Sequence, residues 1–245
     1  MKKQGILSCA IIALLGSGNS WAGSAMVAVA NNFFGPMKQL AADFASTSEH
    51  SIEISTGSTG QLYAQITNGA PFDLFFAADT VRPEKLVLDG AAADELTDSR
   101  GTLVLWSETS DVDVKDQLSS LKFTHLAMAD PKLAPYGLAA QQTMEKMGLY
   151  ASVSDKVVMG KGLNPTYQFV VTGNAELGFV AKSQVYADNQ YKTGSYWEVP
   201  ADSYQEIKQD AVTLNAGKDN LAAKAFLDYL QTERAQSIIA SFGYK

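Results

Sequence analysis

Short apolar runs recur along the chain at intervals that suit buried strands. Residues 26–30 read Met-Val-Ala-Val-Ala, and residues 73–77 form a mostly apolar run of the kind found in parallel sheets. Ile52 and Ile54 alternate with polar neighbours, as in a strand. The same pattern predicts further strands at residues 102–106, 125–129, 156–159 and 177–181.

Between these runs, apolar residues take the spacing of amphipathic helices. Met37, Leu40, Ala41 and Phe44 stand at i, i+3, i+4 and i+7, and Pro36 suits the first turn of their helix. Comparable faces predict helices around Leu62 and Ile66, along 140–147, at 166–172 and, as one long helix, at about 220–241. Alternating strands and helices are typical of an α/β protein with mainly parallel sheets.

The N-terminal residues have the pattern of an export signal rather than of a strand or helix of the folded domain. Lys2 and Lys3 precede an apolar run at residues 6–15, and the small-residue end at Ala22 suits cleavage by a signal peptidase. The run is too short to span a bilayer. We therefore expect residues 1–22 to be a signal peptide, with Cys9 as one of its apolar residues rather than a site of lipid attachment.

Charge narrows the range of partners. The chain has 245 residues, of which 46% are apolar and 18% charged, an ordinary globular composition. Without Lys2 and Lys3 it carries 17 basic and 26 acidic side chains, a net charge of −9. Such a protein disfavours nucleic acid and anionic membranes, and it repels small anions at long range. If it binds an anion, local dipoles have to hold it.

Several predicted strand-to-helix junctions are rich in uncharged hydrogen-bond donors. In open α/β sheets, ligands lie beyond the carboxyl ends of the strands, where the first turn of each helix has free N–H groups that favour an anion. The same residue types are also ordinary helix caps and turn residues, so the pattern leaves both interpretations open. The junctions lie at residues 30–36, 58–60, 134–137 and 162–165.

Other chemistries have weaker support in the sequence. Gly60 is followed by Gln61, whereas a phosphate-binding P-loop needs Lys and Ser or Thr after its glycines. His50 and His125 occur singly, without further ligands at metal-site spacing. Neither a nucleophile elbow nor a Ser, His and Asp arrangement is visible, so we expect no enzyme. Lys132 and Lys161 lie close to two of the junctions.

Four segments resemble the periplasmic molybdate-binding proteins of bacterial ABC transporters. They are "VAVANNFFGPMKQLAADF", "GSTGQLYAQITNGAPFDLFFAAD", "DPKLAPYGLAA" and "VVTGNAELGFVAKSQV", in the order and at the spacing of that family. The resemblance extends from about Val27 to the C-terminus. It implies a two-lobed, type II binding protein with a mainly parallel, helix-flanked sheet in each lobe. We expect lobe 1 at residues 24–102 plus 200–245, and lobe 2 at 103–199.

The resemblance also implies a set of ligand-binding residues. They would hold molybdate or tungstate through its oxygens, without direct ligands to the metal, without a cofactor and without a neutralising side chain. Ala78 and Leu163 would act through the main chain, and Tyr136 would supply a phenolic donor. The expected ligand-binding residues are Asn31, Asn32, Ser58, Thr59, Ala78, Tyr136 and Leu163.

The function implied is that of a periplasmic, monomeric receptor. It would capture molybdate, and tungstate as well, and deliver the ion to the permease of an ABC importer in the inner membrane. A receptor for another tetrahedral oxyanion, such as sulfate, is the alternative.

Overall fold

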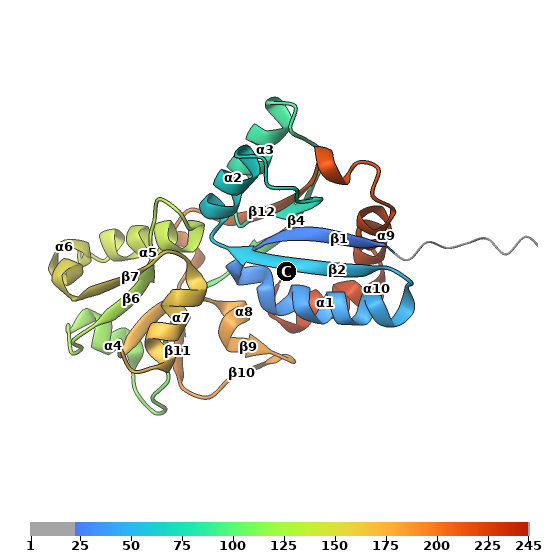
Figure 1. Ribbon diagram of the computed structural model, residues 1–245. Helices are drawn as coiled ribbons and strands as arrows, with labels where there is room; N and C mark the ends of the chain where they lie inside the picture. The colour runs from blue at the N-terminus through green and yellow to red at the C-terminus, as the bar shows by residue number, and fades with distance from the viewer. Residues whose placement is uncertain (1–22, 245) are drawn as a thin grey trace, which may run out of the picture.

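Two lobes, each built around a five-stranded sheet, make up the described part of the chain (Figure 1). The computed structural model describes residues 23–244, apart from the side chains of residues 94–98. The expected signal peptide, residues 1–22, and Cys9 within it lie outside the described residues. The α/β class and the two-lobed architecture expected from the sequence are confirmed.

The sheet of the first lobe joins strands from both ends of the chain. Its strands are β1 (Ser24–Ala30), β2 (Ser51–Gly57), β3 (Leu74–Phe76), β4 (Ala92–Gly101) and β12 (Ile207–Leu214). They lie in the order β2-β1-β3-β12-β4. β1 pairs in parallel with β2 and β3, whereas β12 runs antiparallel to β3 and β4.

The sheet of the second lobe repeats this arrangement. Its strands are β5 (Leu103–Ser107), β6 (Leu126–Ala129), β7 (Val157–Gly160), β8 (Leu177–Ala181) and β11 (Ser195–Glu198). They lie in the order β11-β5-β8-β6-β7, with β6 parallel to β7 and β8 and with β5 antiparallel to β8 and β11. A small hairpin of β9 (Tyr186–Ala187) and β10 (Gln190–Tyr191) follows β8.

The chain passes between the two lobes twice. β4 ends at Gly101 and β5 begins at Leu103, while β11 ends at Glu198 and β12 begins at Ile207. Two short connections of this kind suit a hinge. They lie beside the expected lobe boundaries at residues 102 and 200, although the limits of the lobes stay a prediction.

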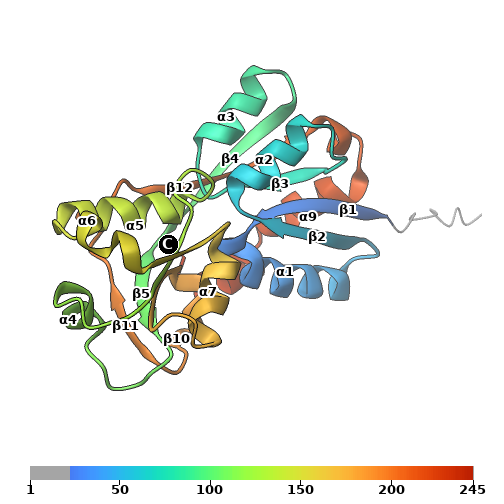
Figure 2. The ribbon, with the colours of Figure 1, turned by 60° about the vertical axis from the view of Figure 1, so that its left-hand side comes forward.

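Helices cover both faces of each sheet. In the first lobe, α1, α9 and α10 pack against one face and α2 and α3 against the other (Figure 1). In the second lobe, α4 and α5 cover one face and α7 the other (Figure 2). None of the described helices is long and apolar enough to cross a membrane. The helices are α1 (Phe34–Thr47), α2 (Thr59–Thr67), α3 (Val81–Leu88), α4 (Val114–Ser119), α5 (Pro135–Lys146), α6 (Tyr150–Val153), α7 (Leu163–Val171), α8 (Lys182–Val185), α9 (Leu221–Leu230) and α10 (Glu233–Ser241), with the 3₁₀ helices η1 (Asn31–Phe33), η2 (Ser154–Lys156), η3 (Ala201–Ser203) and η4 (Asn215–Gly217).

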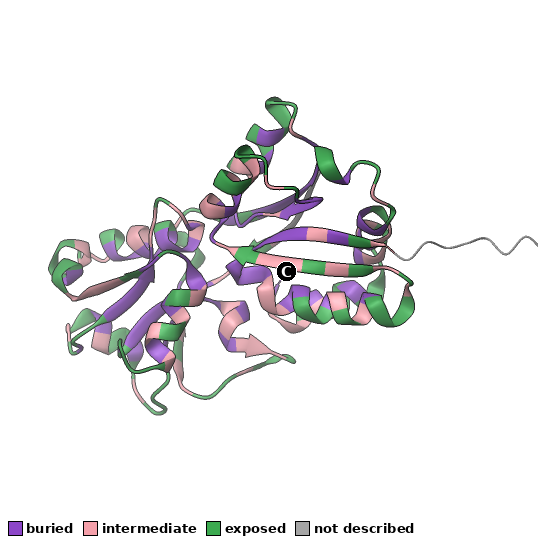
Figure 3. Ribbon diagram, viewed as in Figure 1, coloured by how far each residue is buried: buried purple, intermediate pink, exposed green. Residues whose placement is uncertain are grey.

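The helical face predicted for the first helix is the one that packs in the core. Met37, Leu40 and Phe44 are buried against β1, and the Phe44 ring meets the Phe226 ring of α9 edge to face. Figure 3 shows most strands of the two sheets buried, whereas the edge strand β2 has only exposed and intermediate residues and the outer sides of the helices are mostly exposed. Apolar burial on both faces of each sheet is therefore the main support of each lobe.

Several parts of the fold differ from the sequence-based expectation. The sequence predicted mainly parallel sheets, whereas each sheet has two parallel and two antiparallel pairs. The strands β4, β11 and β12 were not predicted, because none of them shows a long apolar run. The single helix expected at about 220–241 is wrong, since α9 ends at Leu230 and α10 begins at Glu233. Thr232 is extended, with ψ 149°, and its hydroxyl oxygen accepts a hydrogen bond from the Ala235 N–H at 3.2 Å. It caps the second helix, as Thr commonly does.

Removal of this cap tests why the helix is interrupted. Thr232→Ala should lower the free energy of unfolding by about 0.5–2 kcal/mol, because the Ala235 N–H loses its partner. Ser237→Ala is the matched control, since the Ser237 hydroxyl donates to the Glu233 carbonyl inside α10 and caps no N–H. We expect it to change the stability by less than about 0.5 kcal/mol in urea denaturation. Equal losses in the two variants would contradict the capping role.

Candidate anion-binding site

Strand register brings the predicted junctions together in pairs. In the first lobe Ala30 pairs with Gly57, so the chain leaves β1 and β2 at the same level. In the second lobe Ala129 pairs with Gly160, which places the starts of α5 and α7 side by side. The carboxyl ends of parallel strands share one edge of a sheet, and in both lobes this edge faces the other lobe (Figures 1 and 2).

All seven predicted ligand-binding residues line one small cavity between the lobes. The space between atoms here is about 180 Å³, including open solvent at the mouth of the cavity. The first lobe supplies the residues from η1, α2 and the end of β3, and the second lobe supplies those at the starts of α5 and α7. The lining residues are Ala30, Asn31, Asn32, Ser58, Thr59, Ala78, Ala134, Pro135, Tyr136 and Leu163.

The two hydroxyl residues at the start of α2 have different partners. Ser58 is the N-cap: its hydroxyl accepts from the Gln61 N–H at 3.3 Å, and the Gln61 side chain accepts from the Ser58 N–H at 3.2 Å. Thr59 lies one position further and is 1% exposed, and its oxygen accepts from the Ala78 N–H at 3.0 Å. The hydroxyl proton of Thr59 is thus left to be donated, while Ser58 and the Ala78 N–H hold α2 and Thr59 in place.

The two asparagines after β1 also differ. Asn31 accepts from the Thr56 hydroxyl through its side-chain oxygen at 3.4 Å, and its amide nitrogen lies against Gly162 of the second lobe. Asn32 donates both of its amide hydrogens inside the protein, to Gln209 Oε1 at 2.7 Å and to the Tyr244 hydroxyl at 3.0 Å. The side chain of Asn31 therefore faces the gap between the lobes, and that of Asn32 is engaged behind it.

The second lobe contributes a buried phenol. Tyr136 lies in the first turn of α5 after Pro135 and is 2% exposed. Its hydroxyl packs against Gly101, where a side chain would overlap it. Burial, and then the neighbouring Tyr244 and Tyr204, raise the pKa of the Tyr136 phenol well above its usual value. The phenol therefore keeps its proton, and remains a donor, at any physiological pH.

No charged side chain lines this cavity among the described residues. Lys132 and Lys161, the lysines nearest to the predicted junctions in the sequence, both have exposed side chains and do not line it. Arg82 lies at the neighbouring groove, where it pairs with Asp79 and donates to the Lys132 carbonyl at 3.2 Å. An anion in the cavity would be held by neutral hydrogen-bond donors alone.

A buried network behind the cavity includes three residues that the sequence pattern did not indicate. The Tyr244 hydroxyl donates to the Asn32 carbonyl at 3.0 Å, and the Ser183 hydroxyl of the second lobe donates to the same carbonyl at 2.6 Å. Gln209 completes the network through the Asn32 amide. Gln209 and Tyr244 lie 177 and 212 positions from Asn32, so no local signal in the sequence could have found them.

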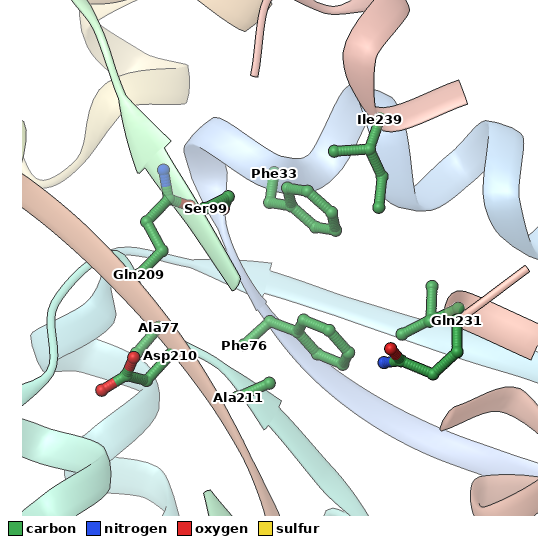
Figure 4. Close-up of a pocket in the computed structure, with 10 residues that line it drawn as sticks. Phe33, Phe76, Ala77, Ser99, Gln209, Asp210, Ala211, Gln231 and Ile239 are labelled. Atoms are coloured by element: carbon green, nitrogen blue, oxygen red, sulfur yellow. The ribbon is translucent and has the colours of Figure 1, made fainter. Parts of the chain in front are cut away.

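A second cavity lies behind this network (Figure 4). Phe33, Phe76 and Ile239 form much of its wall, and the Asp210 side chain is on the opposite side of β12 from Gln209. Its apolar lining and the nearby carboxylate do not suit an oxyanion, because a dianion needs several donors to replace its water.

Two α/β lobes that close on a cavity lined by neutral donors define a solute-binding protein. Residues 25–245 match the family model described as bacterial extracellular solute-binding protein. The molybdate-binding protein ModA of Azotobacter vinelandii is 47% identical over 98% of this chain and 93% of its own length. ModA of Rhodobacter capsulatus is 46% identical over 91% of this chain and 88% of its own. The chain belongs to this family of solute-binding proteins, together with the ModA proteins.

The solved structures agree with this assignment. The periplasmic molybdate-binding protein of Azotobacter vinelandii superposes with a TM-score of 0.86 and 36% identity, covering 90% of this chain and 98% of that one. The family expected from the four sequence segments is therefore confirmed.

Tyr244→Phe tests the network behind the cavity. The variant keeps the ring, which packs edge to face on Phe33 at 5.3 Å between centroids, but it removes one partner each from the carbonyl and the amide of Asn32. The free energy of unfolding should fall by about 1–3 kcal/mol, because buried polar groups lose partners. Tyr196→Phe, at a ring that is 46% exposed, is the control and should change stability by less than about 0.5 kcal/mol. Unfolding in urea measures both, and equal stabilities would show that the Tyr244 hydroxyl is dispensable.

Proposed function

We propose that this chain captures molybdate, and tungstate as well, in the cavity between its lobes and delivers the ion to the permease of an ABC importer. The observation that carries the proposal is the cavity itself: neutral donors from both lobes converge on it, and no charged side chain lines it among the described residues. The 47% identity with a protein named for molybdate binding supports the choice of ion.

We infer that the donors act in two groups. Ser58 and Ala78 position the others, because the Ser58 hydroxyl and the Ala78 N–H already have partners inside the first lobe. The remaining donors would come from both lobes and would meet the oxygens of one ion, the Tyr136 hydroxyl by exchanging its hydrogen bond with Tyr244 for one to the ion. They are the Asn31 amide, the Asn32 N–H, the Thr59 hydroxyl, the Tyr136 hydroxyl and the Leu163 N–H.

Hydrogen bonds from these donors are strong enough to account for tight binding of an oxyanion. A hydrogen bond to a charged oxygen contributes about 1.5–3 kcal/mol net. Closing the lobes and ordering the ion cost part of this free energy. Several such bonds still support a micromolar or lower Kd, which is a binding free energy of about −8 kcal/mol or more negative. Because no counter-charge is present, the ion remains releasable when the lobes open.

Selectivity would follow from the size of the cavity and from the kind of groups that line it. Sulfate is smaller than molybdate, so it would reach fewer of the fixed donors at good distance. Protonated phosphate carries an O–H that needs an acceptor, and a lining of donors leaves that group unpaired. The same donors would bind tungstate, which has almost the size and charge of molybdate.

The transport role places the protein outside the cytoplasm. Residues 1–22 would direct export, and residues 24–102 plus 200–245 and residues 103–199 would form lobes that close about the two connections. In this role the chain is a monomeric receptor and not an enzyme. The closed lobes would present the ion to the permease.

Competition calorimetry tests the proposed ligand. Molybdate and tungstate should bind one to one at micromolar or lower concentration, and sulfate and phosphate should bind at least about a hundredfold more weakly. Bound molybdate should also raise the melting temperature by mass action. Sulfate binding as tight as molybdate binding would overturn the selectivity, and no binding of either would overturn the function.

Tyr136→Phe tests the phenolic donor. Molybdate affinity should fall by about 1–3 kcal/mol, because one donor to the dianion is lost while the ring stays in place. Since the pKa of this phenol is raised, the wild-type affinity should also stay constant from pH 7 to about pH 9. Tyr150→Phe, on α6 at the far end of the second lobe, is the matched control. Unchanged affinity in Tyr136→Phe would remove the phenol from the site.

A further inference from the structure

Gly60 brings the main chains of the two lobes into direct contact. Its N–H, in the first turn of α2, donates to the Leu133 carbonyl of the second lobe at 2.9 Å. A Cβ at this position would lie 3.0 Å from that oxygen and 3.2 Å from the Leu133 Cα. Both atoms belong to the main chain, so no change of rotamer could make room for a methyl group.

Gly162 makes a similar contact from the second lobe. A Cβ there would lie 2.8 Å from the amide nitrogen of Asn31 and 3.2 Å from the Cβ of Ser58, both in the first lobe. The main chain of Gly162 is extended, at φ 178° and ψ 179°, a conformation open to any residue. Close approach of the lobes, rather than backbone conformation, is therefore what requires glycine at this position.

Each glycine adjoins a residue of the proposed site. Gly60 follows Thr59, and Gly162 precedes Leu163, the first residue of α7. The distance between the lobes at these contacts sets the distance between donors from the first lobe and the N–H of Leu163. Hydrogen bonds weaken steeply as they lengthen, so a separation of a few tenths of an ångström would affect every bond that spans the gap.

We propose that Gly60 and Gly162 are positioning residues that set how closely the two lobes approach over the bound oxyanion. This inference rests on the proposed function. Gly60 meets main-chain atoms, which in a close-packed interface cannot give way as a flexible side chain can. Gly162 meets the Asn31 amide, the Ser58 Cβ and, at 3.4 Å, the Ser58 main-chain nitrogen, so both contacts limit how closely the lobes approach. They fix the width of the cage and thereby the distances at which both lobes reach the same ion.

If the glycines act in this way, replacing them should lower the affinity for molybdate without lowering the stability of the ligand-free protein. Gly60 lies inside α2, where alanine has a higher helix propensity than glycine, whereas Gly162 is the N-cap of α7, where glycine is preferred to alanine. At both positions alanine also restricts the unfolded chain. Gly60→Ala should therefore leave the melting temperature of the ligand-free protein unchanged or higher, and Gly162→Ala should change it little because its two effects oppose each other. The same variants should hold the lobes apart when the ion is bound. A residue with a merely structural role would lower the melting temperature instead.

The experiment compares Gly60→Ala and Gly162→Ala with the wild-type chain and with Gly35→Ala. Gly35 is a helical glycine of the first lobe, and its added methyl would meet the ring of Phe242 in the same lobe at 3.2 Å. Calorimetry with molybdate, melting without ligand and small-angle scattering with and without saturating molybdate are measured for each protein.

We expect the two interlobe variants to bind molybdate at least about tenfold more weakly and to stay wider than the wild type at saturation. Gly162→Val should weaken binding further than Gly162→Ala, and Gly35→Ala should bind as the wild type does. Affinities within twofold of the wild type, or a loss equal to that of Gly35→Ala, would overturn the role of the glycines while leaving the proposed function in place. A wild-type protein that binds no oxyanion would overturn both.

Discussion

The proposed function depends on one constraint: a doubly negative ion would have to be stripped of water and held by a negatively charged protein in a cavity that no charged side chain lines among the described residues. Only many neutral donors, aimed at one point from several directions, meet this demand. The paired strand ends at Ala30 and Gly57, and at Ala129 and Gly160, supply those directions. The two sheets are the frame that brings four helix starts to one cavity.

Some of the polar groups at this cavity form hydrogen bonds with other groups of the protein. The Ser58 cap, the bond from Ala78 to Thr59 and the bonds from Asn32 to Gln209 and Tyr244 hold the first lobe in the geometry that binding requires. These bonds join groups within the first lobe and do not involve the ion, so binding would not have to order them. The division explains why a junction so rich in donors leaves only some of them free.

Much of the fold was predictable, because hydrophobic spacing is a local property. Strands β1, β3, β5, β6, β7 and β8 lie within two residues of their expected positions, and the buried face of α1 is the expected one. The antiparallel strand β12 was not predicted, because Gln209 and Asp210 interrupt its apolar pattern. These two residues are buried only by tertiary packing. The break between α9 and α10 at Thr232 was not predicted, because the apolar spacing continues across it. Thr followed by Glu is nevertheless a recognisable helix start.

The sequence by itself determined the α/β class, the strand-to-helix junctions and the resemblance that pointed to Asn31, Asn32, Ser58, Thr59, Ala78, Tyr136 and Leu163. Residue types and their spacing carry that information without reference to distant parts of the chain. Only the tertiary structure decided which atom of each residue is free, that Gln209 and Tyr244 support Asn32, and that Gly60 and Gly162 meet the opposite lobe. These are contacts between segments far apart in the chain, and a donor is free or engaged only once the partner that competes for it has been folded into place.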